Sequence, residues 1–408
     1  MKKISFLFTV LTILFLFTSC ELRSDDVNKT FAMYDSFVLS NETLEAAGLP
    51  VVTIQTENNA RILSKESWLN AKISISNAAS DSYNFDSVDV SIRGRGNTTW
   101  PLYKKPFALK FSKKHQVLGM PKHKRWVLLA NYRDNSFMKN SVAFYLSEKL
   151  GLDYTVRGKF VNLVLNGNYV GLYWLGEAIK VDSSRVNIDE DNDYLIECDT
   201  YYDENWKFKS AIKQLPYMVK NDDSMNDARL DNLENRINEM EQLLYSENFP
   251  VDDTYKNYID IDSFAKFYLV NEIICNVELR HPKSCYFTLE SSTGILKAGP
   301  AWDFDWGGDN PSNKMVLKNS VYYDALFKIP EFREKVNLLM DQLDSSDISQ
   351  EIDNIKSEIN ESAKLDGHRW GTEWRNPVGV YCKSFSGYVE NLKSCVTSRV
   401  NYIKHNPF

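Results

Sequence analysis

Three separated segments of the 408-residue chain carry side chains suited to binding phosphate, holding a metal and moving a proton. The first spans residues 92–111 and combines glycines with threonines and lysines. The second spans 302–306, where two aspartates alternate with three aromatic residues. The third spans 271–284, a polar loop that follows an apolar run. Together these residue types would suit a site that handles a phosphorylated ligand.

The glycine-containing segment has the composition of a phosphate-binding turn. Gly94 and Gly96 free the backbone for a close approach to an anion, and Thr98 adds a hydroxyl group. Lys105 or Lys110 would bring a positive charge back toward the same point. A plain turn between two strands is the alternative, because the segment matches neither a Walker A loop nor a complete G-x-G-x-x-G pattern.

Asp303 and Asp305 are predicted to bind a divalent metal. In an extended segment residues two apart share a face, so the two carboxylates would offer the hard oxygen ligands that Mg²⁺ prefers. The neighbouring aromatic residues would then anchor the opposite face. The alternative is a surface turn with two solvated carboxylates.

The polar loop holds the groups needed for general-base chemistry and directly precedes a predicted hairpin that leads to Asp303. These groups are Glu278, Arg280, His281, Lys283 and Ser284. His281 by itself would more often be a structural or exposed histidine. The chain shows no Ser-His-Asp triad, no glycosidase carboxylate pair and no His-Glu-x-x-His signature.

The hydropathy pattern predicts the elements that position these segments. Alternation across 51–111 indicates short strands, and Asn166-Gly167 predicts a type I′ hairpin turn between 160–165 and 169–175. Helical periodicity appears over 136–150, ended by Gly151, and again over 228–244 and 261–275, the last predicted to be central. Residues 286–298 indicate another hairpin, and the chain after 320 is mainly helical. We therefore expect an α+β protein with two lobes, a β-rich lobe over 35–180 with one helix and a mainly helical lobe over 181–408.

Composition narrows the classes of function. With 43% hydrophobic and 25% charged residues, the chain has ordinary globular usage, unlike disordered or multi-spanning membrane proteins. The net charge of −7 argues against nucleic acid as a partner. An aromatic content of 13% is also typical of secreted proteins that handle glycans.

The first twenty residues predict export. Lys2 and Lys3 precede an apolar run over 4–17 that ends in Thr18-Ser19-Cys20, which resembles a bacterial lipobox with Phe17 in place of the usual leucine. We expect residues 1–19 to be removed, Cys20 to be lipidated and 20–34 to serve as a tether in the cell envelope, facing away from the cytoplasm. An ordinary signal peptide with an incidental cysteine is the alternative. Five cysteines follow, so Cys382 and Cys395 could form a local disulfide, or most of them are buried thiols.

Several motifs in their order along the chain resemble the spore-coat protein H (CotH) kinase family, specifically its secreted lipoprotein branch. They are IRGRGNTTW at 92–100, KKPF at 104–107, NGNYVGLY at 166–173, Glu177 and GPAWDFD at 299–305. The resemblance spans roughly 51–401. It implies an atypical, bilobal protein-kinase-like fold that uses ATP and Mg²⁺ or Mn²⁺ to phosphorylate Ser or Thr of proteins.

The resemblance also implies a role for each candidate residue. Residues 94–99 would cover the phosphates, Lys110 or Lys105 would neutralise them, and Leu175 to Glu177 would form the hinge near the adenine. Glu148, or another acid on the same helix, could pair with the lysine. Glu278 would be the base, and Asp303 would hold Mg²⁺ with Asp305 as its partner.

Two positions depart from the family pattern. The base position is usually Asp, where this chain has Glu278, and Lys283 stands where kinases commonly place a metal-binding Asn. These changes leave open a slow kinase, a rearranged site or a nucleotide-binding pseudoenzyme, and Lys283 could contact the γ-phosphate. The alternative functions are a non-catalytic surface lipoprotein that binds a glycan or an envelope partner, and a structural coat protein that uses a kinase fold only as a scaffold.

Overall fold

The computed structural model describes residues 32–309, 313–371, 382 and 384–408. It is an α+β structure, as the hydropathy pattern predicts. The leader over 1–19, Cys20 and most of the predicted tether lie outside the described residues. Among the described helices, none is both long and apolar enough to cross a membrane.

Within the described part of the chain, seven strands close into a barrel in the order β1-β2-β3-β4-β5-β7-β6. The strands are β1 (Val51–Thr56), β2 (Leu69–Ser76), β3 (Phe85–Gly94), β4 (Phe107–His115), β5 (His123–Leu129), β6 (Gly158–Leu165) and β7 (Asn168–Glu177). All neighbours are antiparallel except β1 and β6, whose parallel pairing closes the barrel. Alternate apolar residues fill its interior, including Ile54, Ile92, Leu109 and Trp126.

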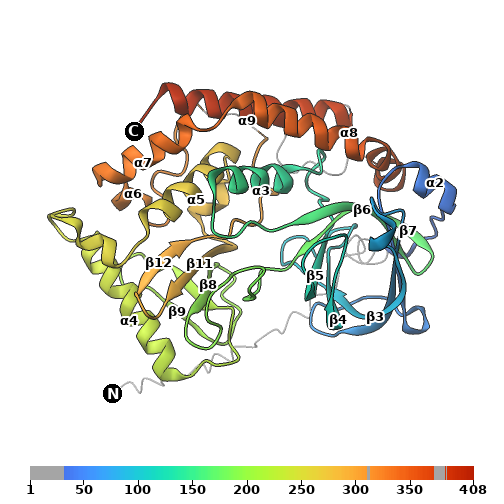
Figure 1. Cartoon of the computed structure of the whole chain (residues 1–408), viewed down its shortest axis with the longest axis horizontal. Helices are drawn as coiled ribbons and strands as arrows, with labels where there is room; N and C mark the ends of the chain where they lie inside the picture. Colours follow the sequence, from blue (N-terminus) through green and yellow to red (C-terminus); the bar gives the residue numbers. More distant parts are fainter. Residues whose placement is uncertain (1–31, 310–312, 372–381, 383) are drawn as a thin grey trace, which may run out of the picture.

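A second sheet has five strands in the described residues, in the order β12-β11-β8-β10-β9. They are β8 (Tyr194–Cys198), β9 (Lys207–Lys209), β10 (Pro216–Val219), β11 (Cys285–Glu290) and β12 (Ile295–Ala298). Figure 1 shows this sheet beside the barrel, with most helices gathered around it or above it. The predicted hairpin over 286–298 is confirmed as β11 and β12.

Most helices surround the second sheet or lie along one side of the molecule, whereas α2 lies beside the barrel (Figure 1). They are α2 (Asn41–Ala46), α3 (Lys139–Leu150), α4 (Asp227–Leu244), α5 (Ile261–Ile274), α6 (Tyr323–Leu326), α7 (Pro330–Asp341), α8 (Ser345–Trp370) and α9 (Phe385–His405). Short 3₁₀ segments cover 32–34, 57–59, 81–83, 253–257 and 277–280. Helix α5 is buried on nearly every side, which confirms its predicted central position.

Local sequence explains where two of these elements turn or end. Asn166 and Gly167 have φ of 50° and 78°, the two positive values that a type I′ turn requires between β6 and β7. Gly151 ends α3 in the left-handed region with φ of 71°. Both features are predicted from the sequence and are confirmed.

Two hydrophobic cores divide the molecule. One fills the barrel, and the other joins the second sheet to the helices. Helix α3 packs in the second core although the chain places it between two barrel strands. The end of α8 is fixed to the barrel by a fully buried ion pair between Lys104 and Asp366, 2.6 Å apart, and Asp366 also accepts a hydrogen bond from the Leu172 amide at 2.8 Å.

The cysteines in the described residues behave mainly as buried apolar groups. Cys198, Cys285 and Cys395 are buried thiols. Cys382 and Cys395 are not joined, so the local disulfide that the sequence left open is absent between these two described residues.

Candidate active site

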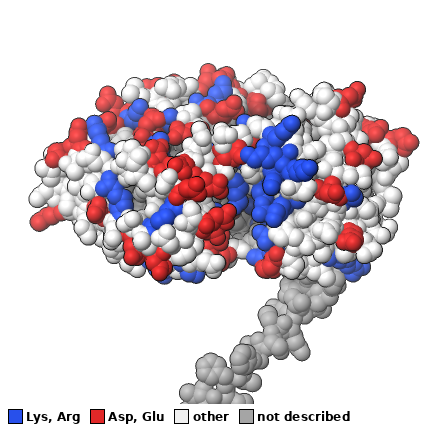
Figure 2. Space-filling view, turned by 60° about the horizontal axis from the view of Figure 1, so that its bottom comes forward, with Lys and Arg blue, Asp and Glu red and all other residues white. Residues whose placement is uncertain are grey.

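A cavity of about 260 Å³ lies where the barrel meets the second core. The barrel contributes the turn after β3 and the end of β5, and the second core contributes residues near 197–204, 278–286 and 302–306. Segments about two hundred residues apart therefore face one another. In the view of Figure 2, acidic side chains gather near the middle of the molecule beside a group of Lys and Arg.

The turn after β3 lines this cavity. Gly96, with φ of 82°, and Thr98 both border it. The Thr98 hydroxyl lies 3.0 Å from the Tyr201 hydroxyl on the opposite wall, so the turn is tied across the cleft. Gly94 has a different role, because the Trp100 ring fills the space that a Cβ at Gly94 would need. The glycines therefore shape the turn, and its 96–99 portion faces the cavity.

Asp303 and Asp305 both line the cavity, but the segment that carries them is not extended. Asp303 has φ of 65°, in the left-handed region, and Asp305 begins a turn. Asn140, at the start of α3, donates a hydrogen bond to Asp305 at 2.8 Å and accepts one from the Phe304 amide at 3.0 Å. The amide of Asn140 thus fixes Asp305, and the buried Phe304 ring anchors the segment.

Burial, and after it the crowding of carboxylates, raises the pKa values of the acids in the cavity. Burial, and then the charge of Glu278, raise the pKa of Asp303, whereas Arg95 lowers it. Burial and the neighbouring Asp303 raise the pKa of Asp305. Burial raises the pKa of Glu278 to about 7, against the lowering effect of Lys283. A divalent cation between these groups would relieve their mutual repulsion.

The polar loop places only part of its predicted set at the cavity. Glu278 and Lys283 line it and form an ion pair of 3.8 Å, and Ser284 lines it as well. His281 is exposed and does not line the cavity, and Arg280 donates to the Val316 carbonyl at 3.0 Å. The sequence therefore identifies the loop, and the structure selects the members that face the site.

Sequence reasoning missed Asp199. Its carboxylate accepts hydrogen bonds from the Tyr201 amide at 2.7 Å and the Ser284 amide at 3.0 Å, which joins the two loops on this wall. Asp199 follows β8 directly, and its position after an apolar strand was the available signal.

Comparison with known families shows the family to which the chain belongs. The sequence model of the CotH kinase protein family matches residues 92–403, about three quarters of the chain. The chain belongs to the CotH kinase family. No curated protein matches it. Membership indicates a kinase-like function and, in general terms, the use of ATP and a divalent metal.

The two lysines proposed to neutralise phosphates in this CotH family member do not line the cavity. Lys110 is exposed, because Phe107, Leu109 and Phe111 point into the barrel and the residue between them must point out. Lys105 is buried and donates to the carbonyls of Trp100 and Leu102 at 2.9 and 3.1 Å. Burial lowers the pKa of Lys105 to about 8.

Arg95 and Lys220 supply positive charge at the cavity instead. The Arg95 guanidinium lies over the Trp302 ring at 5.5 Å, next to Asp303. Lys220 pairs with Glu197 at 2.9 Å and also with Glu204. Neither residue was predicted. The second arginine of the Arg-Gly-Arg-Gly sequence was the one available signal for Arg95.

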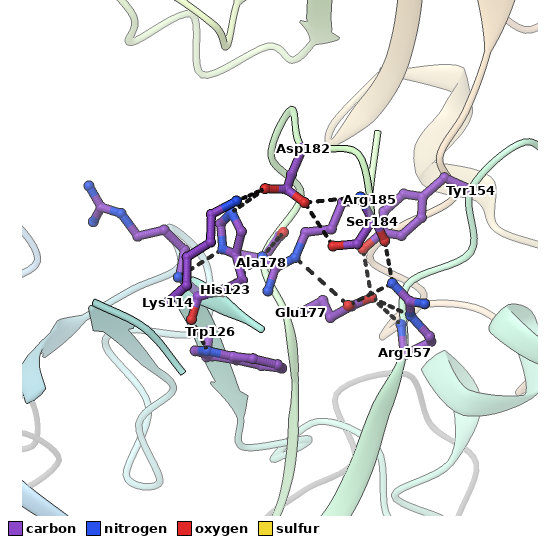
Figure 3. A network of polar contacts seen from close by, with 11 residues as sticks. Lys114, His123, Trp126, Tyr154, Arg157, Glu177, Ala178, Asp182, Ser184 and Arg185 are labelled. Atoms are coloured by element: carbon purple, nitrogen blue, oxygen red, sulfur yellow. Dashed lines mark hydrogen bonds and ion pairs between the residues drawn. The ribbon is translucent and has the colours of Figure 1, made fainter. Parts of the chain in front are cut away.

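The predicted adenine hinge lies elsewhere. Leu175 is buried inside the barrel, and Glu177 is fully buried and does not line the cavity. Glu177 accepts hydrogen bonds from Arg157 Nε at 2.9 Å and Tyr154 at 2.9 Å, beside Arg185 (Figure 3). This network ties the end of β7 to the segment before β6 and to the loop at 184.

Glu148, the acid proposed to pair with the phosphate-neutralising lysine, is exposed on α3. No ion pair joins it to either lysine among the described residues.

Proposed function

We propose that this CotH family member transfers the γ-phosphoryl group of ATP to a Ser or Thr hydroxyl of a protein. One observation carries the proposal: the turn at 96–99, Asp303, Asp305 and Glu278 line one cavity between two hydrophobic cores. Such a cavity between a β-rich body and a mainly helical body is the arrangement expected of a bilobal kinase-like fold.

The residues present fit a divalent metal of the kind that accompanies ATP. Among the described residues, no three His, Cys, Asp or Glu side chains are arranged to hold a metal alone. Mg²⁺ commonly takes only one or two protein carboxylates and completes its shell with water and phosphate. Asp303 and Asp305 would be those carboxylates. When bound, Mg²⁺ or Mn²⁺ would neutralise charge on the phosphates.

The other side chains would position and deprotonate the acceptor. Glu278 would accept the hydroxyl proton as the oxygen forms its bond to the γ-phosphorus and the bond from that phosphorus to the ADP oxygen breaks. Arg95 and the backbone of 96–99 would face the phosphates. Lys283, next to Glu278, would approach the transferred group. In this chain the longer Glu278 and the cationic Lys283 act together as a pair.

Transfer of labelled phosphate from [γ-³²P]ATP to envelope proteins, with Mg²⁺ or Mn²⁺, tests the proposal. We expect incorporation on Ser or Thr that Asp303→Ala abolishes. A thermal shift with ATP and Mg²⁺, absent in Asp303→Ala, should accompany it. A protein that shows neither transfer nor a nucleotide shift, but binds a glycan equally well as Asp303→Ala, would instead be the non-catalytic surface protein.

We also propose that the protein is a lipoprotein held in the cell envelope, on the outer side of the membrane to which it is anchored. The support is the apolar run over 4–17 that ends in Thr18-Ser19-Cys20. Growth with labelled palmitate should label the wild type and leave Cys20→Ala unlabelled. Labelling of both would overturn the anchor.

A further inference from the structure

A group of cations lies on the outer wall of the barrel. Strand register puts Lys110 directly opposite Arg125, on the face that points away from the barrel interior. Arg93 and Arg125 approach the same Trp68 ring, at 4.7 and 5.3 Å. Arg185 donates hydrogen bonds to the carbonyls of Arg125 and Ala178 at 2.8 and 2.7 Å, which holds the segment of Lys180, two residues after Ala178, close to Arg125. We call Arg93, Lys110, Arg125 and Lys180 the basic face.

The charges of the basic face are only partly balanced within the protein, by Glu204 and Asp222 near Lys180. Among the described residues, none of its four cations forms an ion pair, whereas Lys72 on a neighbouring position pairs with Asp89 at 2.5 Å. The hairpin of β4 and β5 adds three more exposed lysines, again without ion pairs among the described residues, at positions 113, 122 and 124. The whole chain carries a net charge of −7. Such a concentration of positive charge is therefore a local feature.

Placing like charges opposite one another across two strands destabilises a sheet. The Lys110 and Arg125 pair carries this cost in the free protein, and a ligand with negative charge would remove it. The basic face is therefore electrostatically complementary to an acidic partner.

The basic face borders a hollow and leads toward the cleft. The lining of this hollow, of about 750 Å³, includes Lys110 and Trp68 on the side of the basic face, together with Lys72 and the carboxylates of Glu57 and Asp89. Strand β3 ends one residue after Arg93, at Gly94, and the next residue, Arg95, lines the cavity of the active site. Two residues of strand span about 7 Å, so positive charge extends from the outer wall to the cleft. Figure 2 shows Lys and Arg gathered beside the acidic middle of the molecule.

We propose that the basic face docks an acidic segment of the protein acceptor. That the docked protein is the phosphoryl acceptor rests on the proposed function; the docking itself does not. Phosphate polymers are bound best by free arginine forks and backbone N–H groups. Here Arg93 and Arg125 lie over Trp68 and Lys180 is half-buried, so the most exposed charge is that of Lys110, and a lysine suits the scattered carboxylates of Asp and Glu side chains.

Fluorescence anisotropy of the full chain with a short labelled peptide of Asp, Glu and Ser tests this docking. We expect binding that weakens with added salt, and no binding of a peptide in which Lys replaces the acids. Lys110→Glu with Lys180→Glu should weaken the acidic peptide about tenfold. The matched control is Lys328→Glu with Lys404→Glu, two exposed lysines of the helical region, which should bind as the wild type does.

Two results would overturn the docking proposal. One is equal binding of the acidic peptide by the wild type and the Lys110 and Lys180 variant. The other is a preference for polyphosphate or an acidic polysaccharide over the peptide through the same two lysines. Because no nucleotide is present, a protein that fails to transfer phosphate can still bind the peptide, so failure of the docking and failure of the catalytic proposal are distinguishable.

Discussion

Glu278 is one methylene longer than the aspartate usual at its position, and its surroundings suit that length. Its carboxylate is 15% exposed and pairs with Lys283 at 3.8 Å. Burial raises its pKa to about 7, close to the pH at which a general base works best. Glu278→Gln should therefore reduce kcat by about 10²- to 10⁴-fold. Initial rates with labelled ATP measure this, and an unchanged thermal shift with ATP and Mg²⁺ would show that nucleotide binding survives.

His123 makes stability depend on pH. The ring is buried, its Nδ1 accepts a hydrogen bond from the Arg125 amide, and Arg185, Lys114 and Asp182 surround it. Burial, and then the charge of Arg185, lower the pKa of His123 to about 4. The folded protein thus holds the ring neutral, while the unfolded chain binds a proton below about pH 6.5. The stability from His123 is complete above pH 6.5 and is lost as the pH falls toward 4.

We therefore expect the free energy of unfolding to drop by about 1 to 2 kcal/mol between pH 7 and pH 5 because of His123. Urea unfolding at several pH values measures it, and His123→Asn should flatten this part of the curve. An equally steep decline in His123→Asn would assign the effect to other groups.

At the scale of elements, the sequence predicts each hairpin and helix well where the local signal is strong. The Asn166-Gly167 turn and the Gly151 helix end are decided by backbone conformation alone, so they could be read directly. The alternation of inward and outward side chains along β4 could also be predicted from the sequence. Phe107 and Leu109 must share the interior face, so Lys110 must point outward. The family template placed Lys110 at the phosphates, and the strand alternation shows why it cannot reach them.

The end of β3 offers a test of how this turn is packed. The Trp100 ring occupies the position that a side chain at Gly94 would need. Gly94→Ala should cost about 1 to 3 kcal/mol in the free energy of unfolding and displace the turn, which reduces the thermal shift with ATP and Mg²⁺. Adding Trp100→Leu should restore part of the stability. The control is Gly167→Ala, where a Cβ meets nothing within 4 Å, so only the positive φ of 78° is strained.

Local sequence patterns could not reveal the contact between α8 and the barrel, because Lys104 and Asp366 are 262 residues apart. Both side chains are fully buried. Asp366→Asn should lower the free energy of unfolding by about 3 to 5 kcal/mol, since it removes the carboxylate that pairs with the fully buried Lys104. Lys104→Met with Asp366→Leu should be less destabilised than Asp366→Asn. Urea unfolding of the three proteins decides, and equal losses would contradict the pairing argument.

At the scale of the whole molecule, closure of the barrel and formation of the cleft depend on contacts between distant segments. The parallel pairing of β1 with β6 joins residues more than one hundred positions apart. Periodicity reports only which face of a segment is apolar, so it predicted strands without their order. The local composition was enough to recognise Asp303, Glu278 and the turn at 96–99 one by one. That Asp199, Arg95 and Lys220 join them at one cavity is visible only in the assembled structure.

The assembled cavity gives the molecule a conflict between stability and function. Burial and Asp303 raise the pKa of Asp305, so the ionised form of Asp305 destabilises the folded state when no metal is bound. That cost is absent at acid pH, where the carboxyl group is protonated in both states. It grows as the pH rises from the pKa of the unfolded chain toward the raised pKa of the folded state, and it is complete above that pKa. With a chelator at pH 8, Asp305→Asn should raise the free energy of unfolding by about 1 to 2 kcal/mol and the Tm by a few degrees. The gain should shrink at acid pH, and the exposed control Asp341→Asn should show none.

With ATP and Mg²⁺ the order of stability should reverse, because the wild type gains stability from the ligand and Asp305→Asn does not. Scanning calorimetry measures the Tm of both proteins with the chelator and with ATP and Mg²⁺. A wild type that stays less stable than Asp305→Asn with the ligand present would show that Asp305 does not serve the nucleotide site.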